Sequence, residues 1–370
     1  IRQGWGSVSS RSSQLAAAVF ATAAVSVCVN ALALFGDDVA AWVALALQSV
    51  VGFWAVLCAV VVSRREVGFL RWWRVLVLAA MASWLVGEVL WWLGSPAGSG
   101  QEAPPVGVAA YFLPPVFSLA AMIVLARYGG GLRFRRYDRR RSFRGVDVLD
   151  GLVAAAAFTI LVAMAGLGAV SGAALPRSQN TAIVIAYSLV ELIVIVVAVL
   201  MAMAYPRERP YRANYLLLSG GVVLIAASDR LVAYLRNVGV DNGDLWGGVG
   251  TILGPLIIAF ALLERRPHPA GSRGDNVMDT VQAILPYIGF LGIIALLAFH
   301  LLIGRDLSAP VILGAMAMVT LVTARQGSAM RAQRLLMRRL YEAQHRLAHQ
   351  VHHDPLTGLP NRAVVRPTPR

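Results

Sequence analysis

The stretch TAIVIAYSLVELIVIVVAVLMAMA, residues 181–204, decides the fold class of this chain. Its side chains are apolar apart from a few hydroxyl groups and a single carboxylate, Glu191. At about 1.5 Å per residue, a helix of this length crosses a hydrocarbon core about 30 Å thick. Because lipid cannot satisfy exposed backbone N–H and C=O groups, a helix is the conformation to expect there. The stretch therefore predicts a membrane-spanning α-helix.

Similar apolar runs recur along the whole chain. Hydrophobic residues make up 58% of the sequence and charged residues 14%, whereas soluble proteins carry about 25% charged residues. The runs lie near residues 15–35, 39–62, 75–93, 107–126, 148–170, 181–204, 215–235, 247–263, 280–303 and 310–324. We therefore predict an all-α, polytopic membrane protein with about ten transmembrane helices, for which membrane lipid is the main partner.

The basic residues indicate how the helices are oriented. Arginine supplies all 33 basic side chains, and nearly all of them lie on alternate connections between the runs. Only Arg177, Arg236 and Arg305 fall on the other connections. The positive-inside rule then predicts ten crossings of a bacterial cell membrane with both termini cytoplasmic. This topology and the attraction of arginine to anionic lipid headgroups explain the net charge of +14, so we expect no nucleic-acid partner.

A polar segment follows the last run and has an apolar pattern of its own. Leu336, Leu340, Ala343 and Leu347 are spaced by four, three and four residues. This spacing is that of the a/d seam of a short coiled coil. No proline and only one glycine, Gly327, separate this seam from the last run. We predict a stalk helix that pairs two copies of the chain in parallel and passes movement of the last span onward.

The segment HHDPLTGLPNR, residues 352–362, carries the most specific motif of the chain. It resembles the DxLTGLxNR sequence that opens a GGDEF (diguanylate cyclase) domain. The matching residues, called the opening motif below, are Asp354, Leu356, Thr357, Gly358, Leu359, Asn361 and Arg362. The resemblance covers only the C-terminal end of the chain. It implies that these residues join the stalk to the first helix of a cyclase domain, in structural rather than catalytic roles.

The resemblance also implies the activity of a larger protein. Members of the family condense two GTP into cyclic di-GMP across a dimer of GGDEF domains with Mg²⁺, and some carry a following EAL phosphodiesterase domain. The GGDEF turn itself would lie downstream, so we expect the chain as given to hold no catalytic residues and no cofactor, and to be inactive as a cyclase. After Ala363 the sequence departs from the family, with Pro367 and Pro369, which we interpret as a truncated or frameshifted end.

Four ionisable residues lie inside the apolar runs, where charges are costly and usually face a bundle interior or an aqueous cavity. They are Glu88 in the third run, Glu191 in the sixth, and Asp229 and Arg230 in the seventh. Neighbouring residues of a helix point about 100° apart, so we expect Arg230 to reach Glu88 or Glu191. Two interpretations remain open. The residues form either a site for an unidentified small ligand or a proton, or an ion-pair network between helices.

The sequence predicts four regions in order along the chain. They are a cytoplasmic N-terminus at 1–14, a ten-span sensory domain at 15–324, a signalling stalk at 325–353 and the start of a GGDEF domain at 354–370. An offset of 141 residues places Glu88 on Asp229. This suggests a parallel repeat of four plus four spans, followed by two further spans.

Two classes of function fit these features. One is a membrane sensor that signals through the stalk to a GGDEF domain, and the other is a ten-span transporter or membrane enzyme that uses the buried acids. Only the first explains the stalk and the opening motif. His345, His349 and His353 share one side of the predicted stalk, but no acid or cysteine completes a ligand set, and we expect no metal site.

Overall fold

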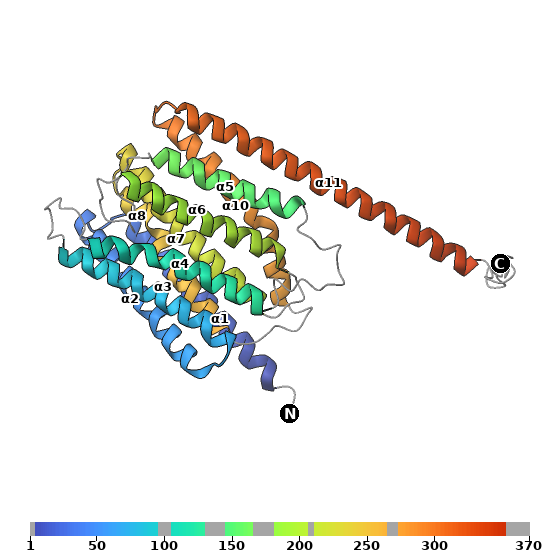
Figure 1. The fold of residues 1–370 in the computed structure, drawn as a ribbon, viewed down its shortest axis with the longest axis horizontal. Helices are drawn as coiled ribbons and strands as arrows, with labels where there is room; N and C mark the ends of the chain where they lie inside the picture. The colour runs from blue at the N-terminus through green and yellow to red at the C-terminus, as the bar shows by residue number, and fades with distance from the viewer. Residues whose placement is uncertain are drawn as a thin grey trace. The chain divides into compact units, whose positions relative to one another are not determined.

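The computed structural model describes residues 4–94, 105–129, 145–165, 181–205, 211–264 and 273–352. Within these ranges the chain forms α-helices joined by short turns, without a β-strand (Figure 1). The helices are α1 (Gly4–Ala31), α2 (Asp37–Arg65), α3 (Phe69–Gly94), α4 (Pro105–Tyr128), α5 (Gly145–Ala165), α6 (Thr181–Ala204), α7 (Arg212–Val238), α8 (Gly243–Gly247), α9 (Val249–Leu263), α10 (Arg273–Leu302) and α11 (Ala309–His352). The all-α prediction is confirmed for this part of the chain.

Most of these helices are suited to a membrane. Among the described residues, eight segments are long and apolar enough to cross one: those in α2 to α7, the pair α8 and α9, and α11. The helices α1 and α10 carry shorter apolar stretches, Ala18–Ala31 and Gly289–Leu302. Each predicted run therefore coincides with helix. The membrane-spanning character of the fold is supported, while the count of ten crossings stays a prediction.

The helix ends differ from the ends of the apolar runs in several places. The helix α1 is already formed at Gly4, whereas its apolar run begins near residue 15, and it ends at Ala31, before the end of the run near residue 35. The run at 247–263 is divided between α8 and α9 at Gly248, whose N–H donates to the Asp244 carbonyl and caps α8. The reason is that apolarity marks only the part suited to hydrocarbon, whereas backbone hydrogen bonds decide where a helix ends.

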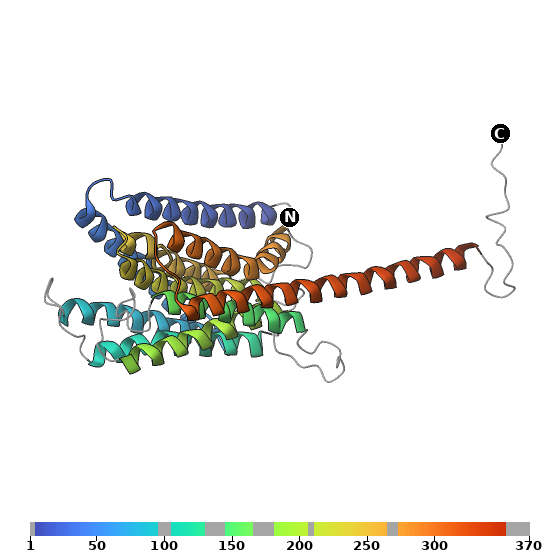
Figure 2. The same cartoon turned by 90° about the horizontal axis from the view of Figure 1, so that it is seen from above.

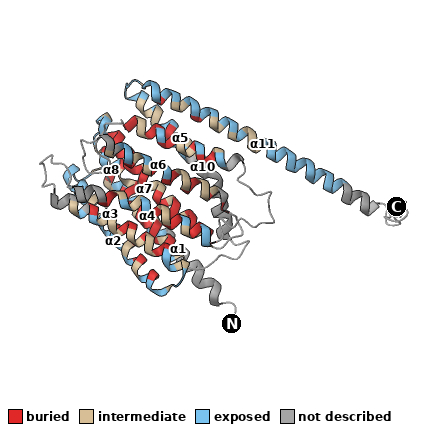
Figure 3. Ribbon diagram, in the orientation of Figure 1, coloured by how far each residue is buried: buried red, intermediate tan, exposed pale blue. Residues whose placement is uncertain are grey.

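The helices before residue 320 pack side by side, as two views of the ribbon show (Figures 1 and 2). The helix α3 lies along α4, α7 lies along α9, and α2 contacts both α3 and α9. On another side, α5 packs against α6, α7 and α10. Buried residues gather on the facing sides of these helices (Figure 3). The largest core cluster takes side chains from α2, α3, α4, α6, α7 and α9, so α7 lies in the middle of the fold.

Glycines bring α7 and α9 into close contact. A Cβ at Gly254 would lie 2.9 Å from the Gly221 carbonyl oxygen, and one at Gly250 would lie 2.7 Å from the Leu224 carbonyl oxygen. Because these neighbours are backbone atoms, they cannot move aside as a flexible side chain would. Small residues of this kind let membrane helices approach closely and pack tightly. The contact fixes the part of α7 that carries the ionisable residues.

The chain divides into two compact units, Ile1–Val319 and Thr320–Arg370. The helix α11 contributes to both, because it is a single helix from Ala309 to His352. In the second unit the described residues all belong to this helix, which starts well before the expected stalk boundary at residue 325. The helical conformation of the stalk is thus present, whereas its pairing with a second copy stays a prediction.

Candidate functional site

A buried ion pair joins α6 to α7. Arg230 Nε donates a hydrogen bond to Glu191 Oε2 at 2.8 Å, and Arg230 Nη2 donates to the same oxygen. The two side chains are only 7% and 5% exposed. In an interior without water, the attraction between a guanidinium and a carboxylate is stronger than at a surface, and loss of either partner leaves a stranded charge. The pair therefore holds α6 in position against α7.

Tyr187 supports this pair from α6. It lies one turn before Glu191, where residues four apart are neighbours on a helix. Its hydroxyl hydrogen-bonds with the Glu191 carboxylate, and Arg230 Cζ lies 5.5 Å from the centroid of its ring. A hydroxyl that donates to an anion and a ring face beneath a cation both stabilise the charged pair. The sequence reasoning missed Tyr187, although its i, i+4 spacing to Glu191 was a usable signal.

Asp229 brings a second carboxylate to the same place. Its side chain is buried and interacts electrostatically with Glu191 and with Arg230. Two carboxylates close to one guanidinium repel each other while both are attracted to the cation, and the low dielectric of the interior strengthens both effects. The energy of this cluster therefore depends strongly on the relative position of α6 and α7.

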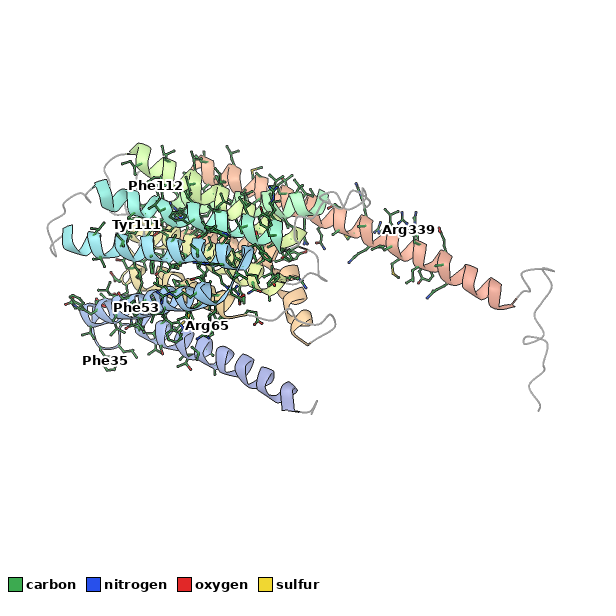
Figure 4. All side chains as sticks on the ribbon, turned by 60° about the horizontal axis from the view of Figure 1, so that its bottom comes forward. Phe35, Phe53, Arg65, Tyr111, Phe112 and Arg339 are labelled. Carbon is green, nitrogen blue, oxygen red and sulfur yellow. The ribbon has the colours of Figure 1, made fainter. Side chains whose placement is uncertain are left out.

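An aromatic layer borders the ion pair. Trp84 of α3, Tyr111 of α4 and Tyr187 of α6 form a buried cluster. Phe112 meets the Tyr187 ring edge to face, with the ring centroids 5.4 Å apart. At Gly87 a Cβ would lie 3.2 Å from the Tyr111 ring, so the small residue admits the aromatic side chain. Tyr111 and Phe112 are marked on α4 in Figure 4, and through them the ion pair is connected to α3 and α4.

Ser228 connects the cluster to α8 and α9. Its hydroxyl donates to the Gly247 carbonyl oxygen and accepts a hydrogen bond from the Gly250 N–H at 3.1 Å. The residue is buried, and it directly precedes Asp229 on α7. Three helices are therefore tied together within one turn of α7. Sequence reasoning did not identify Ser228, because its partners are backbone groups that only the fold brings near.

The structure assembles three of the four ionisable residues singled out in the sequence. Arg230 pairs with Glu191, one of the two partners expected for it, and Asp229 lies beside them. The side chain of Glu88 lies outside the described residues, so its place in the cluster stays a prediction. Of the two interpretations left open, the geometry of the described residues favours the ion-pair network.

The predicted seam residues of the stalk are exposed within a single chain. Leu336 is 64% exposed and Leu340 54%, and Ala343 is exposed as well. The side chain of Leu347 and the whole opening motif, residues 354–362, lie outside the described residues. Exposed apolar side chains on a helix are typical of a binding surface, and no other helix packs against them within the described residues.

No family model, no curated protein and no solved structure matches this chain. Within the described ranges, no three His, Cys, Asp or Glu side chains lie together as a metal site. The described cluster also consists of paired charges and aromatic rings instead of a nucleophile next to a general base. The arrangement holds α6 against α7 through paired charges and an aromatic ring.

Proposed function

We propose that this chain is the membrane-embedded sensory and signal-transducing region of a cyclic di-GMP signalling protein. Its helices cross the bacterial cell membrane ten times, with both termini in the cytoplasm. A signal detected within the bundle passes through a dimeric stalk to a cytoplasmic GGDEF domain. That domain forms cyclic di-GMP from GTP with Mg²⁺, and an EAL phosphodiesterase domain follows it in some proteins of this type.

One observation carries the proposal. The helix α11 begins in an apolar segment suited to a membrane and extends to His352, two residues before Asp354, where the opening motif starts. Between Val311 and His352 the helix contains no proline, so nothing in the sequence breaks it. A stiff helix that links a membrane span to the first residue of a cyclase-like motif is the arrangement a transducer requires.

The distribution of arginine supports the orientation. Arginines lie on both sides of the turn between α2 and α3 and fill the connection before α5, whereas the connections after α3 and α5 are almost free of arginine. By the positive-inside rule the arginine-rich side is cytoplasmic, and α11 then ends on that side. Arg331, Arg334 and Arg338 would lie close to the inner leaflet, where anionic lipid attracts them.

The ionic cluster is the part of the bundle best suited to respond to a signal. Glu191 and Arg230 hold α6 against α7, and any cue that shifts these helices changes the energy of the pair. A small ligand could act here by competing for either charge. In the full-length protein, Glu88→Gln, Glu191→Gln and Asp229→Asn should each alter the response. If all three leave both output and response unchanged, the cluster is not the sensor site.

A second candidate function is a ten-span transporter or membrane enzyme. It is favoured by the buried Glu191, Asp229 and Arg230, because intramembrane charges commonly mark transport pathways. The two proposals differ in what lies beyond the stalk. A transporter would tolerate removal of residues 325–370, whereas a sensor would lose its output entirely.

The deciding experiment begins with the coding DNA downstream of the Arg370 codon, translated in all three frames. We expect a GGDEF turn in frame or after a one-base shift. The full reading frame and residues 1–370 are then expressed side by side in membrane vesicles and supplied with GTP and Mg²⁺. The longer protein should form cyclic di-GMP and the shorter one none. Absence of a GGDEF turn, or product from residues 1–370 alone, would contradict the proposal.

A further inference from the structure

The membrane part of α11 touches the bundle along one side. Val311 and Met318 are 3% and 1% exposed, and they are seven residues apart, which is close to two whole turns. Between them, Gly314 lies against α5, where a Cβ on this glycine would be 2.9 Å from Ile160 Cγ1. Ile160 itself is 1% exposed, so it has little room to move away. The contact between Gly314 and Ile160 thus fixes how α11 is rotated against α5.

The stalk seam falls on this same side of α11. A helix turns by about 100° per residue, so Met318 and Leu336 are separated by about five whole turns. Val311 and Leu347 are separated by about ten whole turns. The residues that face the bundle and the residues predicted to face a second copy therefore lie on the same side of a single helix, with Arg325 between the two groups.

Three of the six arginines between residues 325 and 353 lie on the opposite side. Arg331, Arg334 and Arg338 are all exposed, and each points about 140° to 160° away from Leu336 around the helix. If two copies pair in parallel through the seam, these cations face outward and their mutual repulsion is screened by salt. Because Leu336, Leu340 and Ala343 are apolar and these three cations point away from them, the seam can meet the same seam of a second copy without bringing these charges together.

We infer that the same side of α11 packs against α5 in the membrane and against a second copy of the chain in the stalk. The Gly314–Ile160 contact then determines the direction in which the seam residues face. This inference rests on the proposed dimeric sensor. A helix without an internal proline transmits rotation along its length, so a change at Gly314 reappears at Leu336 and Leu340. The bundle controls which residues of the two stalks meet.

Cysteine cross-linking in membrane vesicles tests this on the full chain. The native thiols are first removed with Cys28→Ala and Cys58→Ala. Single cysteines then replace residues on the seam and on the basic side, and disulfide formation between copies is measured for each. The positions are 334, 336, 337, 338, 340 and 341. We expect the highest yields for Leu336→Cys and Leu340→Cys, and the lowest for Arg334→Cys and Arg338→Cys.

The scan is repeated after Gly314→Leu, which places a bulky side chain against Ile160. We expect the position of maximal cross-linking to move from 336 and 340 to the neighbouring positions 337 and 341. Adding Ile160→Ala should restore the original pattern by making room. Gly292→Leu on α10 is the matched control, because a Cβ there meets no atom within 4 Å, and it should leave the pattern unchanged.

The outcomes separate this inference from the proposed function. If no stalk position forms a cross-link, the dimeric stalk is absent and the proposed function fails with it. The proposed function also fails if the seam cysteines do not react with a water-soluble maleimide, because the apolar side of the stalk would then lie against lipid. If Leu336→Cys and Leu340→Cys cross-link but Gly314→Leu leaves the pattern unchanged, only the inference is wrong. Should Gly314→Leu fail to insert, Ile160→Ala alone must shift the pattern.

Discussion

The helices α9 and α11 are both apolar, but they are held very differently. In the α8–α9 segment 67% of the apolar window is buried, whereas in α11 the share is 11%. Glycines explain the first value, because Gly250 and Gly254 press α9 against the backbone of α7. In α11 only Gly314 makes a comparable contact among the described residues, and it meets a side chain. The helix α9 is packed tightly into the bundle, whereas α11 contacts it through few buried residues.

This difference assigns separate tasks to the two regions. The α6–α7–α9 region keeps its ionisable residues in a fixed geometry, since hydrogen bonds, glycine contacts and an ion pair all meet there. Because α11 has few buried contacts with the bundle, a change at the Gly314–Ile160 contact alone should be enough to change its rotation. A sensor needs both properties, a stable place where the signal acts and a mobile element that carries it away.

The largest effect is expected for breaking the ion pair in the rigid region. Arg230→Met removes the cation and leaves Glu191 buried without it, which should lower the free energy of unfolding by about 3 to 5 kcal/mol. Replacing both residues, with Glu191→Leu and Arg230→Met, should recover part of the loss, since Glu191 is no longer a stranded charge and only the Asp229 carboxylate stays buried without the cation. Thermal unfolding in detergent measures both variants. A double variant as unstable as the single one would show that packing, and not charge, is what Arg230 provides.

A smaller but still clear effect is expected from filling the glycine contact between α7 and α9. Gly254→Ala places a methyl group 2.9 Å from the Gly221 carbonyl oxygen, and overpacking of this kind costs about 1 to 3 kcal/mol. Gly327→Ala in α11 is the control, because a Cβ there meets no atom within 4 Å. The control should match or exceed the parent in stability, since alanine favours helix over glycine. Equal losses of stability in both variants would show that α9 and α11 do not differ in how tightly their glycines are packed.

Most of the helices could be predicted from the sequence because they contain a long apolar run, although the run at 247–263 is divided between α8 and α9. Their ends could not, since the polar residues that precede α1's apolar part are compatible with helix and no proline stops it. The break at Gly248 was hidden for a similar reason. An apolar run reads as continuous even where a glycine caps one helix and starts the next.

Only two arguments could predict the site from the sequence: the energetic cost of burying a charge, and the angle between residues on one helix. Charges inside apolar runs are expensive, which singled out Glu191, Asp229 and Arg230, and the angle between neighbours excluded the pair Asp229–Arg230. The choice of Glu191 over other acids depends on how α6 packs against α7, which no spacing within one helix reveals. Ser228 was out of reach for the same reason, because its partners are backbone groups of α8 and α9.

Removal of one hydroxyl should cost less than the two changes above. Ser228→Ala loses the hydrogen bonds to Gly247 and from Gly250, and the unfolding free energy should fall by about 1 to 3 kcal/mol because buried backbone groups lose their partner. Ser219→Ala is the matched control. Its buried hydroxyl bonds only to the Leu216 carbonyl of the preceding turn, so its loss disturbs no second helix. In thermal unfolding, Ser228→Ala should have the lower midpoint temperature. The reverse order would show that Ser228 does not stabilise the packing of α7 against α8 and α9.

The smallest effect on bundle stability is expected in the stalk, where the effect on pairing should be large. Leu336→Asn places an amide in the predicted seam, and Leu335→Asn places the same amide about 100° away, off the seam. Both side chains are exposed within one chain, at 64% and 57%, so thermal unfolding of the bundle should change by no more than about 0.5 kcal/mol in either variant. Cross-linking or light scattering in nanodiscs should show loss of the dimer for Leu336→Asn alone. If both variants lose the dimer, the whole stalk surface pairs without a seam, and rotation of α11 could not select which residues meet.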